Sequence, residues 1–191
     1  MARIPYATIE ETPEKIQEFF SRLTANTNRV MNLHKMMAHS PAAVREFIRI
    51  GNRLLYRAEL SDRLRELVII RVSELCDSRY EWVQHLPIAL GTGLSKEQLE
   101  GLKDWRNSGL FTEEEKTVLA FTEEVVNDHQ ASDATFGAAA KFLDHTSLVE
   151  LTLSIGYWSM VAKFLRTFQV DIEDGLLEAT GDSLPHGGPV G

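Results

Sequence analysis

The sequence predicts an all-α protein built around one core. Apolar residues recur at helical spacing along most of the chain, and no segment shows the apolar–polar alternation of a half-buried strand between turn residues. Hydroxyl or acidic residues that favour helix N-termini precede several of these segments. With 191 residues and 43% hydrophobic content, the chain has enough apolar side chains for a sizeable core.

The first third of the chain is expected to hold an arm and two helices. Residues 1–11 are interpreted as an extended arm. Thr12 is expected to cap the first helix, with Pro13 at the first helical position, where its missing N–H costs nothing. Residues 26–28 should end this helix. A Ser-Pro pair at 40–41 repeats the start signal and predicts the next helix.

Two consecutive helices form the predicted centre of the fold. Ser61 and Asp62 can both cap a helix that carries residues 64–75, and because this helix is apolar on more than one side it should lie centrally. Asp77 is expected to cap the next helix, over 78–90. Pro87 lies inside it and should kink or shorten it, because proline lacks the N–H donor.

Three capping boxes mark the helices that follow, at 95–98, 112–115 and 147–150. The second box opens a strongly amphipathic helix, and a shorter helix is expected at 136–143. From the third box a long helix is expected to run to about Val170.

The predicted organisation is a single domain over 1–175 followed by a tail. Residues 176–191 are rich in glycine and proline and are expected to be disordered. A weak echo between residues 64–67 and 148–151 leaves open a duplication into two helical halves.

Composition limits the classes of partner and the compartment. A net charge of -8 and a pI near 5.3 argue against a nucleic-acid groove or an anionic membrane surface. The N-terminus lacks the apolar segment of a signal peptide, and the longest apolar run, 148–165, carries charges and is shorter than the ~20 residues that a bilayer needs. Cys76 is the single cysteine, so no intramolecular disulfide can form. A cytoplasmic protein is expected.

Candidate chemistry concentrates in the two central helices. Glu81 and His85 are four residues apart, so on one helix they share a face about 6 Å apart, with Tyr80 beside it. Glu66 could approach from the preceding helix. Imidazole titrates near neutrality and a carboxylate can orient it, which is what proton transfer requires.

Other interpretations of these residues stay open. Glu81 and His85 could be a solvated surface pair that stabilises the helix. Glu66, Glu81 and His85 could instead ligate a metal, although such sets usually contain more than one histidine. Cys76 could be a lone nucleophile or a small buried hydrophobe.

Residues 64–67, 80–85 and 88–95 resemble the carboxymuconolactone decarboxylase family, which includes the AhpD-like alkylhydroperoxidases. The peroxidase branch carries a Glu, eleven residues, Cys-x-x-Cys, three residues and His. In this chain that register holds Glu66, Ser78, Glu81 and His85, so both redox cysteines are absent. Because Ser78 and Glu81 cannot form a disulfide, the departure favours the decarboxylase branch.

The resemblance implies an AhpD-like helical homo-oligomer that acts on a small molecule without cofactor or metal. The expected activity is acid–base chemistry on a small lactone or related carbonyl compound. In this hypothesis His85 is the proton shuttle and Glu66 its orienting partner, Glu81 is a second acid or base, and Tyr80 donates a hydrogen bond to a developing oxyanion. Two alternatives are a peroxidase that uses Cys76 with an external thiol, and a non-catalytic oligomer that binds a small molecule.

One electrostatic difficulty accompanies this hypothesis. An anionic substrate would be repelled by two ionised glutamates. Either one glutamate is protonated by burial, or a counter-charge comes from Arg65, Arg71 or Arg79.

Overall fold

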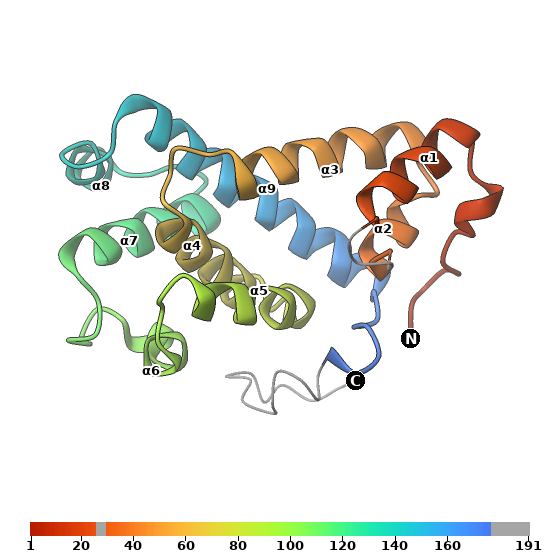
Figure 1. The fold of residues 1–191 in the computed structure, drawn as a ribbon. Helices are drawn as coiled ribbons and strands as arrows, with labels where there is room; N and C mark the ends of the chain where they lie inside the picture. The colour runs from red at the N-terminus through yellow and green to blue at the C-terminus, as the bar shows by residue number, and fades with distance from the viewer. Residues whose placement is uncertain (26–29, 177–191) are drawn as a thin grey trace.

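The computed structural model describes residues 1–25 and 30–176. Within these ranges the secondary structure consists of helices, without β-strands (Figure 1). The all-α prediction is therefore confirmed. The expectations for residues 26–28 and for the tail after Leu176 lie outside the described residues. The α-helices are α1 (Glu14–Leu23), α2 (Asn32–Met37), α3 (Pro41–Tyr56), α4 (Asp62–Leu75), α5 (Arg79–Gly91), α6 (Lys96–Glu100), α7 (Glu113–Asp128), α8 (Asp133–Ala139) and α9 (His145–Phe168).

Helix α4 lies at the centre, as its apolar pattern predicts. It packs against α5, α7 and α9, and all residues from 65 to 74 are buried. The Ser61 hydroxyl caps it by accepting a hydrogen bond from the Leu64 N–H at 3.4 Å. A helix buried on all sides needs partners for its polar side chains, which explains why the charged residues of α4 all lie in ion pairs or hydrogen bonds.

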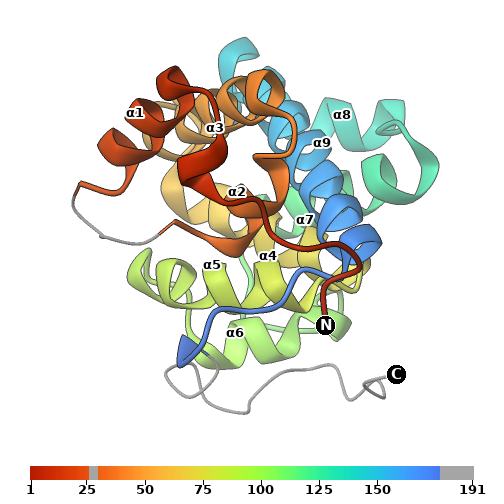
Figure 2. The same ribbon diagram turned by 90° about the vertical axis from the view of Figure 1, so that its right-hand side faces the viewer.

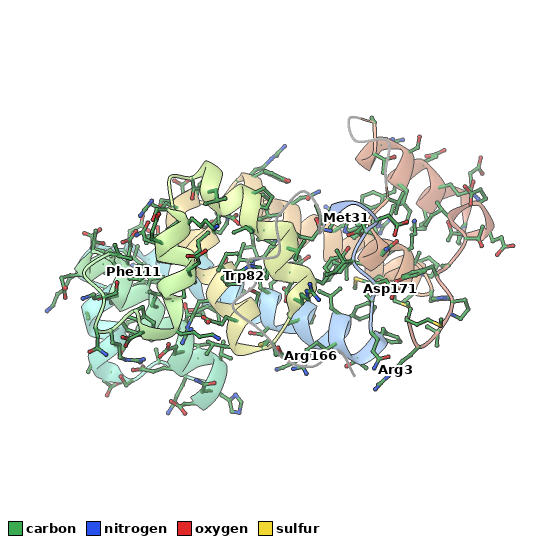
Figure 3. All side chains as sticks on the ribbon, turned by 90° about the horizontal axis from the view of Figure 1, so that it is seen from below. Arg3, Met31, Trp82, Phe111, Arg166 and Asp171 are labelled. Carbon is green, nitrogen blue, oxygen red and sulfur yellow. The ribbon has the colours of Figure 1, made fainter. Side chains whose placement is uncertain are left out.

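Two apolar clusters meet at α4. Val68 and Ile69 belong to a cluster shared with α1, α2, α3 and α9, whereas Leu67 and Ile70 belong to one shared with α5, α6 and α7. In Figure 3, Phe111 of the second cluster lies toward one end of the molecule and Trp82 near its middle, whereas Met31, which packs against the first cluster, lies on the other side of Trp82. Different sides of α4 therefore pack into the two clusters and join them.

The turn between α4 and α5 corrects one predicted cap. Asp77 has a φ of 53°, a left-handed conformation, and Ser78 takes the N-cap position instead. An N-cap residue needs an extended backbone, and Asp77 is used to reverse the chain. The Asp77 carboxylate pairs with Arg166 of α9 at 3.2 Å. Helix α5 continues past Pro87 to Gly91, so the proline does not shorten it.

Two of the three predicted capping boxes are confirmed, those of Ser95 and Thr112. The third is wrong. Asp144 caps α9 by accepting from the Ser147 N–H at 2.7 Å, so the helix begins three residues earlier. Glu150 instead accepts hydrogen bonds from the backbone N–H groups of residues 59 and 60, and so ties the segment before α4 to α9.

Smaller differences concern the predicted ends of two other helices. Helix α1 begins after Pro13, and the Thr12 hydroxyl donates to the Ile9 carbonyl at the end of a short 3-10 turn, Ile9–Glu11. Helix α8 begins at Asp133, where Ser132 caps it, rather than at 136. The Ser132 hydroxyl accepts a hydrogen bond from the Thr135 N–H at 3.2 Å, which explains the earlier start of α8.

The N-terminal arm and the segment after α9 lie together across the ends of the helices (Figure 2). The Arg3 N–H donates to the Phe168 carbonyl at 2.9 Å, and the Tyr6 hydroxyl donates to Asp171 at 3.0 Å. From there residues 171–176 cross the N-terminal half of α5. This crossing segment brings Glu173 to the candidate site.

Helix α9 is long and apolar enough, by length and composition, to span a bilayer. However, 61% of its most apolar window is buried against other helices. Its contacts with α4, α7, α3 and α5 make it a core helix of the domain.

Candidate active site

His85 is held by Glu66 across the interface of α4 and α5. The Nδ1 of His85 lies 2.8 Å from Oε2 of Glu66, and both side chains are buried. Arg65 donates from Nε to the other Glu66 oxygen at 3.2 Å and from Nη1 to Asp62 at 2.6 Å. Because the Glu66 carboxylate is a hydrogen-bond acceptor, the neutral His85 ring is assigned a proton on Nδ1 and a free Nε2.

The Glu81 carboxyl is buried without a hydrogen bond or ion pair to offset the loss of its hydration. Its side chain is 2% exposed, and neither carboxylate oxygen has a hydrogen-bond partner. Burial raises the pKa of Glu81 to about 8, and the polar Ser78 side chain offsets only part of that rise. Glu81 is therefore mostly a neutral carboxylic acid at pH 7, with an O–H group to donate.

A cavity of about 430 Å³ opens between α3, α5, α9 and the crossing segment. His85 and Glu81 both border it, whereas Glu66 lies behind His85 and is fully buried. Trp158 forms part of the wall, with its ring edge-to-face against His85 at a centroid distance of 4.7 Å. Tyr56 and Ile88 border the cavity while exposing much of their surface, so they mark its mouth.

Tyr80 also borders the cavity, but its hydroxyl is engaged by the crossing segment. It donates to Glu173 at 2.5 Å, and burial together with the Glu173 charge raises the pKa of Tyr80. The same Glu173 carboxylate accepts from the Asn32 N–H at 2.7 Å and from the Gln84 amide. In this arrangement the Tyr80 proton points to Glu173 rather than to a substrate oxygen, and its predicted role stays a prediction.

Cys76 lies at the end of α4 and is not among the residues that border the cavity. Its thiol is half-buried, and burial followed by the Glu81 charge raises the pKa of Cys76. A raised pKa reduces the thiolate fraction at neutral pH, and the thiolate is the reactive form. The environment therefore favours the interpretation of Cys76 as a small packed side chain.

The arginines offered as counter-charges are committed elsewhere or exposed. Arg65 is paired with Glu66 and Asp62, and Arg71 with Glu74 and Glu123. Arg79 is exposed. Of the two solutions to the charge difficulty, protonation of one glutamate by burial is the one that the geometry favours. Within the described ranges, no three His, Cys, Asp or Glu side chains group in a way that could hold a metal ion.

The arrangement of the helices defines an AhpD-like fold. Residues 41–124 match the model of the carboxymuconolactone decarboxylase family, which confirms the predicted resemblance over this part of the chain. A curated relative, the uncharacterized protein YnjA of Escherichia coli strain K12, is 32% identical over 110 residues. That match covers 56% of this chain and only 60% of the relative.

Two solved structures have a similar fold at low sequence identity. A peroxidase-related protein from Ralstonia eutropha JMP134, described as an alkylhydroperoxidase AhpD core, matches with a TM-score of 0.79 and 16% identity, over 92% of this chain and 94% of that one. A cysteine-to-alanine variant of the debrominase Bmp8, in complex with 2,3,4-tribromopyrrole, matches with a TM-score of 0.76 and 15% identity, over 94% and 97%. At these identities the likeness establishes the fold alone.

Sequence reasoning missed Glu173. It lies 93 residues from the tyrosine that it contacts, in a segment without periodic pattern, and no local signal marks it. Trp158 lies in the apolar pattern of α9, where an aromatic residue is typical of core packing. Only the packing of α9 against α5 shows that its ring also borders the cavity.

Proposed function

We propose that the chain catalyses cofactor-free acid–base chemistry on a small lactone or related carbonyl compound bound in the cavity. The observation that carries this proposal is the buried Glu81 carboxyl without a partner, on the same cavity wall as an imidazole held through Nδ1 by Glu66. A neutral carboxylic acid and an imidazole with a free Nε2 are a proton donor and a proton acceptor in one apolar enclosure.

In the proposed reaction, Nε2 of His85 removes a proton from a carbon that is acidified by the substrate carbonyl. The electron pair of the broken C–H bond moves toward the carbonyl oxygen and forms an enolate, to which the Glu81 O–H donates. Return of the proton from His85 to a different carbon shifts the double bond. If the carbon carried a carboxylate, cleavage of that C–C bond would release carbon dioxide and give the same enolate.

The test uses α-angelica lactone, an uncharged unsaturated lactone whose double bond moves by proton transfer alone. The expected result is an accelerated double-bond shift with incorporation of solvent deuterium, followed by proton NMR in deuterated buffer. His85→Gln should lower the rate by about 10²–10⁴, which is the usual contribution of a positioned acid or base.

The matched control is His145→Gln, because His145 is an exposed histidine at the start of α9, and this variant should leave the rate unchanged. If the wild-type protein gives no acceleration over buffer, or if both histidine variants behave alike, the proposal is wrong. Tight binding without turnover would favour the non-catalytic alternative.

The peroxidase alternative requires Cys76 to react with a hydroperoxide and an external thiol to reduce it. The raised pKa of Cys76 and its position away from the cavity wall argue against this activity. A Cys76→Ser variant is therefore expected to retain the proton-transfer activity in full. The homo-oligomeric state and the cytoplasmic location stay predictions, of which light scattering after gel filtration tests the first.

A further inference from the structure

The cavity wall has an unusual balance of charge. Among the described residues, no lysine or arginine borders the cavity. Two histidines do, but burial lowers the pKa of His34 to about 4, so its ring is neutral at pH 7. Any positive charge that His85 acquires is balanced by Glu66 at 2.8 Å. The described wall therefore offers a bound anion no uncompensated cation.

Carboxyl groups are present on the same wall. Glu173 is 5% exposed and accepts hydrogen bonds from Asn32, Tyr80 and Gln84, an arrangement suited to an ionised carboxylate. Glu81 adds a second carboxyl, neutral at pH 7. A ligand carboxylate would thus lose its hydration and meet a like charge, and burial of an unpaired charge is among the most costly events in protein interiors.

Aromatic side chains form much of the remaining wall. Phe47 and Tyr157 stack with their ring centroids 4.9 Å apart, and Trp158 lies edge-on to Tyr157 at the same distance. Flat walls of this kind favour flat ligands, which gain both burial and ring contacts. The Nε1 of Trp158 is a buried donor without a partner, and Glu81 has two buried oxygens in the same condition. These atoms have almost no exposed surface, so a ring oxygen would meet them only after a rotation of the Glu81 or Trp158 side chain.

We propose that this cavity selects an uncharged, flat ring compound, a neutral lactone rather than a lactone carboxylate. The assignment of the ligand as a lactone rests on the proposed function, and the inference narrows that substrate class to uncharged lactones. A neutral substrate has no carboxylate to lose, so the reaction becomes removal and return of a proton rather than decarboxylation. The preference for an uncharged ligand follows from the charges of the side chains that border the cavity.

The experiment compares 2-pyranone-5-carboxylate with its methyl ester, two flat lactones of nearly equal size that differ in charge at pH 7. Isothermal titration calorimetry on the full chain measures both dissociation constants. The ester is expected to bind at least about 10-fold more tightly than the carboxylate. Equal or tighter binding of the carboxylate, or no binding of either compound, would overturn the inference.

A pair of glycine variants tests whether binding takes place in the cavity. Gly51 of α3 borders the cavity, and a Cβ added there would collide with the Tyr157 hydroxyl. Gly156 of α9 is exposed, and a Cβ there meets nothing within 4 Å. Gly51→Ala should weaken ester binding several-fold, whereas Gly156→Ala should not change it. Ester binding that is unaffected by Gly51→Ala would place the ligand elsewhere and contradict the inference.

Equilibrium binding separates this inference from the proposed function. If the ester binds preferentially but no lactone is turned over, the charge selection stands and the proposed catalysis fails. If α-angelica lactone is turned over while the carboxylate binds as well as the ester, the catalysis stands and the charge selection fails.

Discussion

Glu81 and Glu123 are both buried acids, but their surroundings shift their pKa values in opposite directions. Glu123 of α7 is 8% exposed and accepts hydrogen bonds from Trp105, Arg106 and Arg71. Burial alone would raise its pKa, but these three donors outweigh that effect and hold the pKa of Glu123 below its usual value. Glu81 has the burial without the donors, and its pKa rises to about 8.

The difference indicates that Glu123 stabilises the fold, whereas Glu81 is available for chemistry. The network around Glu123 joins α4, α7 and the segment that follows α6, and its charges are balanced within the fold. Glu81 joins nothing and borders a cavity. A group that is costly to bury and stabilises no neighbour is typical of a functional site, where perturbed pKa values concentrate.

The largest expected effect concerns the pH dependence of stability. Because the folded-state pKa of Glu81, about 8, lies above its model value of 4.5, the folded chain binds more protons than the unfolded chain between these pH values. The contribution of Glu81 is therefore fully present below about pH 4.5 and is lost as pH rises through about 8. At 1.36 kcal/mol per pKa unit, the loss amounts to at most about 5 kcal/mol.

Urea denaturation of the wild type and of Glu81→Gln measures this contribution. The free energy of unfolding of the wild type should fall relative to that of Glu81→Gln between pH 5 and pH 8.5, because glutamine does not titrate. Parallel pH profiles for the two proteins would mean that Glu81 ionises normally, and the contrast with Glu123 would disappear.

A smaller effect is expected from Glu123→Gln. The amide cannot balance Arg71 and Arg106, and removal of one partner from a buried ion pair typically costs about 3–5 kcal/mol. Because Arg71 keeps Glu74, we expect about 3 kcal/mol, measured by urea denaturation at pH 6.5. The matched Glu81→Gln variant should instead be more stable than the wild type at that pH, by up to about 3 kcal/mol, because the wild-type carboxyl is neutral in the folded chain and ionised in the unfolded chain. Equal losses in the two variants would contradict the distinction.

Local signals in the sequence predict most of the architecture. The central position of α4 follows from a helix that is apolar on more than one side, and the boxes at Ser95 and Thr112 follow from their spacing. The third box fails because Asp144 lies three residues before Ser147 and is an equally good cap. Glu150 then serves the backbone of residues 59 and 60 instead, a long-range contact that no local pattern encodes.

The candidate site likewise contains contacts that the sequence predicts and contacts that it does not. The approach of Glu66 to His85 could be anticipated, because the two helices are consecutive and joined by a short turn. The lack of a partner for Glu81 could not be, since it depends on every element that surrounds the carboxyl. Glu173 was equally hidden, because the crossing segment has no periodicity to place it. Pairs between adjacent helices are visible in a sequence, but the composition of a cavity wall is not.

The most direct test of the account is the titration of Glu81 itself, followed by carbon-13 NMR of side-chain carboxyls in glutamate-labelled protein. The Glu81 resonance is assigned by its absence in Glu81→Gln. The account predicts a neutral carboxyl at pH 6.5 that ionises with a midpoint near pH 8, while Glu123 stays ionised down to acidic pH. A Glu81 midpoint near 4.5 would contradict the account, because a charged carboxylate could not serve as the proton donor.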